Sequence, residues 1–68
     1  MMYKIVSPEE CILDIEGYTA FNEYLMDNPD VIQGHVVEYL KGKDEFKITL
    51  GARSTSTVYD ILFAVQQN

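Results

Sequence analysis

Hydrophobic residues in the middle of the chain alternate with polar ones in a pattern typical of a β-hairpin. Two strand-like runs, residues 35–41 and 45–50, flank Gly42-Lys43, a pair suited to a two-residue type II′ turn. Pairing around this turn places one set of apolar side chains on a common face: Val37, Tyr39, Phe46, Ile48 and Leu50. Glu38 then meets Lys47 on the opposite face, as expected for a half-buried hairpin.

Two other segments have the period of an amphipathic helix. In residues 57–67 the apolar positions recur every three or four residues, at Val58, Ile61, Leu62 and Val65. Thr57 and Asp60 fit a capping box at the start of this helix. A second helix is predicted over residues 18–28, because Phe21, Tyr24 and Leu25 fall on one side of it. It ends there because Pro29 disfavours helical geometry in the residue before it. Pro29 then lies either in a type I turn or in one short helical turn.

The N-terminal segment has two interpretations. Alternation of Cys11, Leu13 and Ile15 with polar neighbours favours a hairpin of residues 3–6 and 11–15. The alternative, a long helix over residues 8–27, would bury Asp14 and place Gly17 mid-helix. We therefore predict an α+β fold of order ββαββα, a four-stranded antiparallel sheet of two hairpins with two helices on one face. The alternative order is αββα.

Composition indicates one compact domain spanning residues 1–68, with 47% hydrophobic and 24% charged residues. So short a chain has a small margin of stability unless a disulfide, a bound metal or self-association stabilises it. A single cysteine, Cys11, excludes an internal disulfide, and with a single histidine, His35, no structural zinc site can be assembled. We expect no metal and no cofactor. Self-association is the remaining stabiliser, and we keep a homo-oligomer as an expectation.

Net charge is confined to the first half of the chain. Residues 1–34 carry seven carboxylates against Lys4 alone, a balance of −6, whereas acidic and basic residues cancel in residues 35–68. Such asymmetry concerns steering and association rather than fold. Phosphate backbones and anionic lipids require clustered Lys and Arg, so we expect neither nucleic acid nor membrane as a direct partner. The short, proline-broken apolar run at the N-terminus does not fit a signal peptide, and a cytoplasmic location is expected.

The first functional hypothesis is a non-enzymatic protein-interaction module. Distributed carboxylates with aromatic residues between them can imitate the charge of a nucleic acid, so its specific form is an inhibitor that occupies a basic, nucleic-acid-binding protein. Tyrosine suits such an interface because it offers a large contact area with a polar tip. The predicted partner-binding residues are Asp14, Glu16, Glu23, Asp27, Tyr24 and Phe63.

The alternative hypothesis is a small-anion or ligand-binding domain that uses residues 51–57. This loop leaves a predicted strand and enters a predicted helix, where free amides, hydroxyls and one guanidinium gather. Its candidate anion-binding residues are Arg53, Ser54 and Ser56, although the spacing of a phosphate-binding loop is absent. No nucleophile, base and orienting group can be assembled from the sequence, so no catalytic residue is predicted and we do not expect an enzyme.

Overall fold

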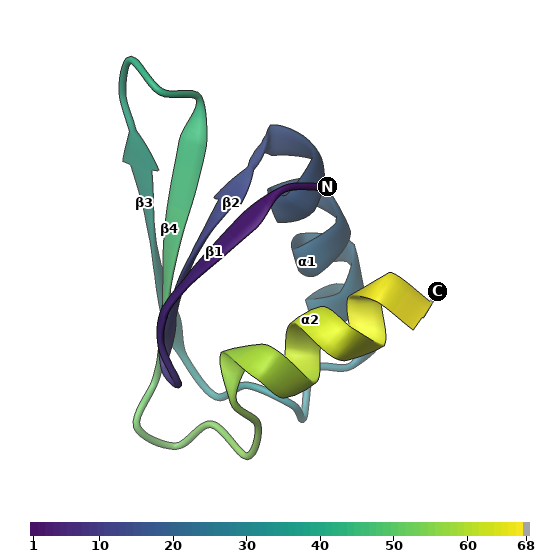
Figure 1. Ribbon diagram of the computed structural model, residues 1–68. Coiled ribbons are helices and arrows are strands. Elements are labelled where there is room, and N and C mark those ends of the chain that lie inside the picture. Colours follow the sequence, from purple (N-terminus) through teal and green to yellow (C-terminus); the bar gives the residue numbers. More distant parts are fainter. Residues whose placement is uncertain (68) are drawn as a thin grey trace.

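The chain forms four strands and two helices in the predicted order, in a computed structural model that describes residues 1–67. The elements are β1 (Tyr3–Ser7), β2 (Glu10–Asp14), α1 (Ile15–Asp27), β3 (His35–Leu40), β4 (Glu45–Leu50) and α2 (Val58–Gln67). All neighbouring strands are antiparallel, in the spatial order β1-β2-β4-β3. Both helices lie on one face of the sheet (Figure 1). The α+β prediction is confirmed, and the αββα alternative is wrong because residues 10–14 form a strand.

The first hairpin follows the alternation read from the sequence. Cys11 and Leu13 are fully buried toward the helices, whereas Ile12 between them faces the open side of the sheet. The backbone amide of Glu9 donates to the Ser7 hydroxyl at 3.3 Å, which stabilises the tight connection between β1 and β2. A long helix through this segment would have forced Asp14 into the core, and the hairpin avoids that cost.

Helix α1 begins three residues earlier than predicted, at Ile15. The cause is Asp14, whose extended backbone ends β2 and whose carboxylate accepts a hydrogen bond from the amide of Gly17 at 2.7 Å. Ile15, expected on the core face of a strand, is instead 53% exposed. After the helix, the Val31 amide donates to the Asn28 carbonyl at 3.1 Å, so Pro29 lies in a β-turn.

The second hairpin has the predicted register but a longer loop. Tyr39 lies opposite Phe46, and strand pairing ends at Leu40 and Glu45. The Lys43 amide donates to the Leu40 carbonyl at 3.1 Å, with Gly42 at φ +90° in the third position of that turn. Residues 41–44 therefore form the loop in place of the predicted two-residue turn.

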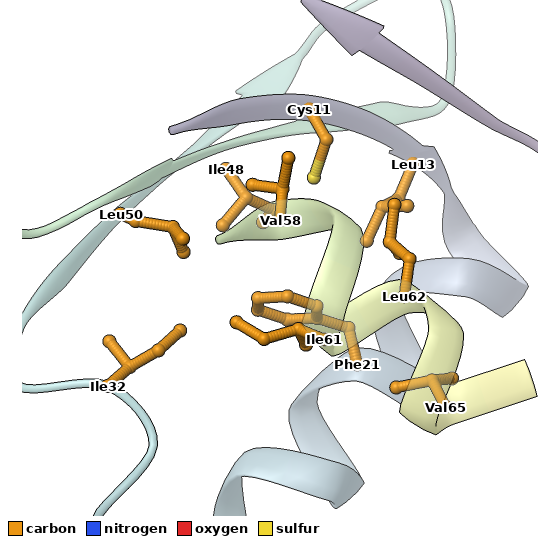
Figure 2. Close-up of a cluster of buried hydrophobic side chains, with 10 residues drawn as sticks. All are labelled: Cys11, Leu13, Phe21, Ile32, Ile48, Leu50, Val58, Ile61, Leu62 and Val65. Carbon is orange, nitrogen blue, oxygen red and sulfur yellow. The ribbon is translucent and has the colours of Figure 1, made fainter. Parts of the chain in front are cut away.

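The core lies between the sheet and the two helices (Figure 2). Its buried side chains are Cys11, Leu13, Phe21, Ile32, Ile48, Leu50, Val58, Ile61, Leu62 and Val65. The capping box predicted for α2 is confirmed, because the Asp60 carboxylate accepts from the Thr57 amide at 3.2 Å and the Asp60 amide donates to the Thr57 hydroxyl at 3.4 Å. This cap holds the start of α2 against the sheet and so places the apolar stripe of the helix in the core.

Candidate protein-interaction surface

The helical layer, defined as α1 and α2 together, carries only negative charge. Its charged residues are Glu16, Glu23, Asp27 and Asp60, and neither helix contains Lys or Arg. Positive charge lies elsewhere, in the loops and on the open face of the sheet. Of the seven carboxylates in the first half of the sequence, three lie on α1 and so in the helical layer, which covers one side of the sheet (Figure 1): those of Glu16, Glu23 and Asp27.

Two ion pairs lie on the opposite side of the molecule, on the open face of the sheet. Lys47 lies 3.1 Å from Glu10, and Lys4 lies 3.9 Å from Glu45. The predicted meeting of Glu38 and Lys47 is correct as a strand register, but the nearest carboxylate to the Lys47 ammonium is that of Glu10 on β2. Such pairs at a solvated sheet face contribute little to stability, and these two together add no net charge.

An acidic groove runs between α1 and α2. It is open, about 410 Å³ in volume, and is lined by Ala20, Glu23, Tyr24, Asp27 and Val65. Glu23 and Asp27 are exposed and lie one helical turn apart, whereas Tyr24 is half-buried. Three of the predicted partner-binding residues therefore come together here, with carboxylates over a partly apolar floor. Such a groove suits a basic side chain with an aliphatic stem.

An aromatic groove lies on the other side of α2, against the edge strand β1. Its volume is about 370 Å³, and its lining residues are Tyr3, Ile5, Tyr59, Asp60, Leu62, Phe63 and Gln66. Phe63 is 66% exposed and Tyr59 is 55% exposed. Phe63, one of the predicted partner-binding residues, therefore lies on one wall of this groove together with Tyr59. Sequence reasoning missed the opposite wall, Tyr3 and Ile5, because it comes from the far end of the chain.

Two of the predicted partner-binding carboxylates have intramolecular partners at the start of α1. Asp14 caps the helix, and its hydrogen bonds to the amides of Gly17 and Met2 lower the pKa of its carboxyl. Glu16 accepts from the N-terminal ammonium at 3.3 Å. Neither residue lines the acidic groove or the aromatic groove.

The loop before α2 is held by its own hydrogen bonds. The Ser54 hydroxyl donates to the Ser56 carbonyl at 2.6 Å and accepts from the Ser56 amide at 3.2 Å. Ser54 and Ser56 share a hollow of about 440 Å³ with Glu9, whereas Arg53 is exposed and does not line it. The structure therefore does not unite the three predicted anion-binding residues, and a carboxylate opposes an anion in that hollow.

Cys11 and His35, the single cysteine and the single histidine, lie apart from both grooves. No cluster of three or more His, Cys, Asp or Glu side chains among residues 1–67 is placed to hold a metal ion. Cys11 is buried, and burial raises the pKa of its thiol to about 11. His35 is exposed on β3. Neither helix of the described chain has the length and apolar character needed to cross a membrane.

Comparisons of the chain with protein-family models, with curated proteins and with solved structures gave no match.

Proposed function

We propose that this protein is a non-enzymatic interaction module whose helical layer binds a basic surface on another protein. The observation that carries the proposal is the acidic groove, where Glu23 and Asp27 flank Tyr24 on a layer that contains no Lys or Arg. A partner approaching this groove meets two carboxylates with no Lys or Arg on either helix beside them, and their negative charge steers association and penalises acidic competitors. In its specific form the partner is a nucleic-acid-binding protein, whose basic cleft the carboxylates occupy in place of phosphates.

The aromatic groove supplies the second part of the proposed interface. Charge alone gives association rate and specificity, whereas buried aromatic anchors supply most of the binding free energy in protein interfaces. Phe63 and Tyr59 are large, exposed and next to the acidic groove across α2, so one partner can contact both. Binding would therefore respond both to removal of charge on α1 and to truncation of Phe63.

Charge variants matched in size test the proposal. Glu23→Gln with Asp27→Asn removes two charges from the acidic groove, whereas Glu45→Gln with Asp44→Asn removes two charges from the second hairpin. Immobilised wild type and both variants are exposed to a nuclease-treated lysate at about 0.1 M and about 0.5 M salt, between which the screening length falls from ~10 Å to a few Å. We expect basic proteins that bind the wild type and the hairpin variant at low salt only.

Competition identifies the kind of surface bound. Proteins retained through a mimic of nucleic acid should be released by added duplex DNA, because both ligands need the same cations. Retention that is equal for all three immobilised proteins and insensitive to salt would overturn the electrostatic proposal. If partner proteins stay bound at high salt but are lost from Phe63→Ala, the interface is the aromatic groove. Charge mimicry would then be excluded as the mechanism.

A further inference from the structure

Strand β3 is an edge of the sheet that nothing in the described chain covers. It projects with β4 beyond the two helices (Figure 1), and five of its six residues are exposed. Val36 is 65% exposed on the open face, and Tyr39 is 49% exposed on the face that carries the helices. Exposed apolar side chains on both faces of an edge strand are unusual in a monomer, because such edges readily pair with another strand.

The unpaired backbone groups of β3 belong to alternate residues. The Gly51 amide donates to the Gly34 carbonyl at 2.8 Å, which marks that pair as a hydrogen-bonded pair of the antiparallel ladder. Such pairs recur every second residue, so even-numbered residues of β3 point their amides and carbonyls toward β4. The odd-numbered residues point theirs outward: His35, Val37 and Tyr39. An incoming strand would therefore bond to these three residues.

The other edge of the sheet has the protection that β3 lacks. Strand β1 has a register irregularity between Ile5 and Ser7, carries Lys4 and is followed at once by Pro8. Bulges, lysines and prolines are the usual means by which proteins keep edge strands from pairing. The pairing of β3 with β4 is regular from His35 to Leu40, and β3 itself contains neither lysine nor proline.

We propose that β3 pairs antiparallel with β3 of a second copy of this chain, around a two-fold axis at Val37, to give a continuous eight-stranded sheet. A two-fold axis normal to the sheet can pair only residues whose side chains lie on the same face. The axis must therefore lie between the two copies of one residue of β3, which then faces its own copy. Two such registers pair five of the six residues of β3, one centred on Val37 and one centred on Glu38. Charge decides between them.

Centring on Glu38 would place two carboxylates directly opposite each other in a close, non-hydrogen-bonded pair, which destabilises a sheet. Centring on Val37 places Val37 opposite its own copy, His35 opposite Tyr39, and Val36 opposite Glu38, with no like charges in contact. It also uses the outward-facing backbone groups of the odd-numbered residues, which gives about six main-chain hydrogen bonds. On the helix side, the apolar row through Ile48 and Val37 continues into the second copy.

The dimer leaves the proposed partner surface free, because the helices lie away from β3 (Figure 1). Each copy carries a net charge of −6, so salt should strengthen self-association by screening the repulsion between copies. The proposed binding of a basic partner should weaken with salt. The two proposals therefore fail or succeed independently.

Two lysine substitutions on neighbouring residues test the dimer and its register. Val37→Lys places two ammonium groups at the two-fold axis, whereas Val36→Lys places an ammonium opposite Glu38. By sedimentation equilibrium at roughly 10⁻⁴ M chain, we expect twice the 7.8 kDa chain mass for the wild type and Val36→Lys, and the single chain mass for Val37→Lys. A monomeric wild type would overturn the proposal. If both substitutions weakened the dimer equally, the Val37-centred register would be overturned. In that register Val36 faces Glu38, and it faces an apolar residue only in a different register.

Cysteine cross-linking gives a second readout that does not depend on affinity. In the proposed register the two Val37 Cα atoms lie about 5.5 Å apart, within the range of a disulfide, whereas the two Val36 Cα atoms lie about 8 Å apart. Mild oxidation should therefore link Val37→Cys rapidly and Val36→Cys slowly. Tyr59→Cys on α2 measures random collision, and wild type, with only buried Cys11, serves as the blank. Linking of Val37→Cys no faster than Tyr59→Cys would overturn the dimer.

Discussion

The carboxylate of Asp14 and the backbone amide of Gly17 form the 2.7 Å hydrogen bond that begins α1. The second carboxylate oxygen of Asp14 accepts from the Met2 amide at 3.1 Å, so one side chain joins the start of β1 to the start of the first helix. These two bonds favour the charged form of the carboxyl and lower its pKa from the ordinary 3.8, the bond to Gly17 having the larger effect. A residue expected to contact a partner is therefore a structural cap.

Replacement of Asp14 by asparagine should change how stability depends on pH. Because the folded-state pKa of Asp14 is lowered, its charge stabilises the fold above the ordinary value of 3.8, and this stabilisation is lost as pH falls through the folded-state value. The asparagine side chain would keep an oxygen for the Gly17 amide but carry no charge. We expect wild type to exceed Asp14→Asn in urea midpoint at about pH 7, by a margin that shrinks as pH falls below 3.8.

Asp14→Ala is the companion variant, since it removes the acceptor as well as the charge. Its melting temperature should lie roughly 4–8 °C below that of wild type, the shift that loss of one helix cap produces in a domain of this size. This deficit should persist at low pH relative to Asp14→Asn. A difference between wild type and Asp14→Asn that stayed constant down to pH 2 would contradict the role of the Asp14 charge.

Gly51 lies against the chain segment that leads into β3. A Cβ atom at this position would meet the carbonyl oxygen of Gly34 and would come within 2.8 Å of the carbonyl oxygen of Gln33. Backbone cannot move aside as a flexible side chain can, and the Gly51 amide already donates to Gly34 at 2.8 Å. Gly51→Ala should destabilise the fold by about 1–3 kcal/mol in urea unfolding. Exposed Ala52→Ser is the control, and equal midpoints for the two variants would refute the steric account.

Adjacent residues of α2 should differ sharply in their effect on stability. Leu62 is 2% exposed and belongs to the core, whereas Phe63 is 66% exposed. Leu62→Ala should cost about 2–5 kcal/mol through lost burial and the cavity left behind. Phe63→Ala should change the free energy of unfolding by less than about 0.5 kcal/mol. A large loss from Phe63→Ala would mean that this side chain is structural, and it would then be unsuitable as a probe of partner binding.

The fold could be predicted because its patterns are local. Alternation at Cys11 and Leu13 and the helical stripe from Val58 to Val65 each lie within one element, and each reports a buried face. The start of α1 could not be predicted in the same way. Asp14 fits both the strand alternation and a helix cap, and only the folded chain shows that it ends β2 and caps α1. The two-residue turn predicted at Gly42-Lys43 was wrong for a similar reason, since a glycine followed by any residue suits several types of turn.

The candidate surface could be predicted only in part, for the same reason. Glu23 and Asp27 are neighbours on one helix, so helical spacing alone places them together. Their groove also needs Val65 of α2, and the aromatic groove needs Tyr3 of β1 beside Phe63. These contacts depend on how elements pack. A spacing of four residues between Tyr59 and Phe63 was the only local signal of the second groove.

The last prediction concerns Cys11, whose side chain is fully buried between the sheet and the helices. Burial raises the pKa of its thiol from 9.0 to about 11, so at about pH 8 the reactive thiolate is roughly a hundredfold rarer than in an unfolded chain. Exclusion of reagent slows the reaction further. We expect labelling by a disulfide reagent to be slow in buffer and to accelerate with urea as the chain opens.

Because labelling of Cys11 requires opening of the core, its rate also reports how often β2 and β4 separate from the helices. Leu62→Ala should therefore accelerate labelling in the absence of urea, and Phe63→Ala should not, since only the former loosens the packing over Cys11. An exposed thiol introduced by Tyr59→Cys gives the unprotected rate in the same protein. Labelling of wild type as fast as that exposed thiol would show that the core around Cys11 is open, and it would contradict the packing described between β2, β4 and α2.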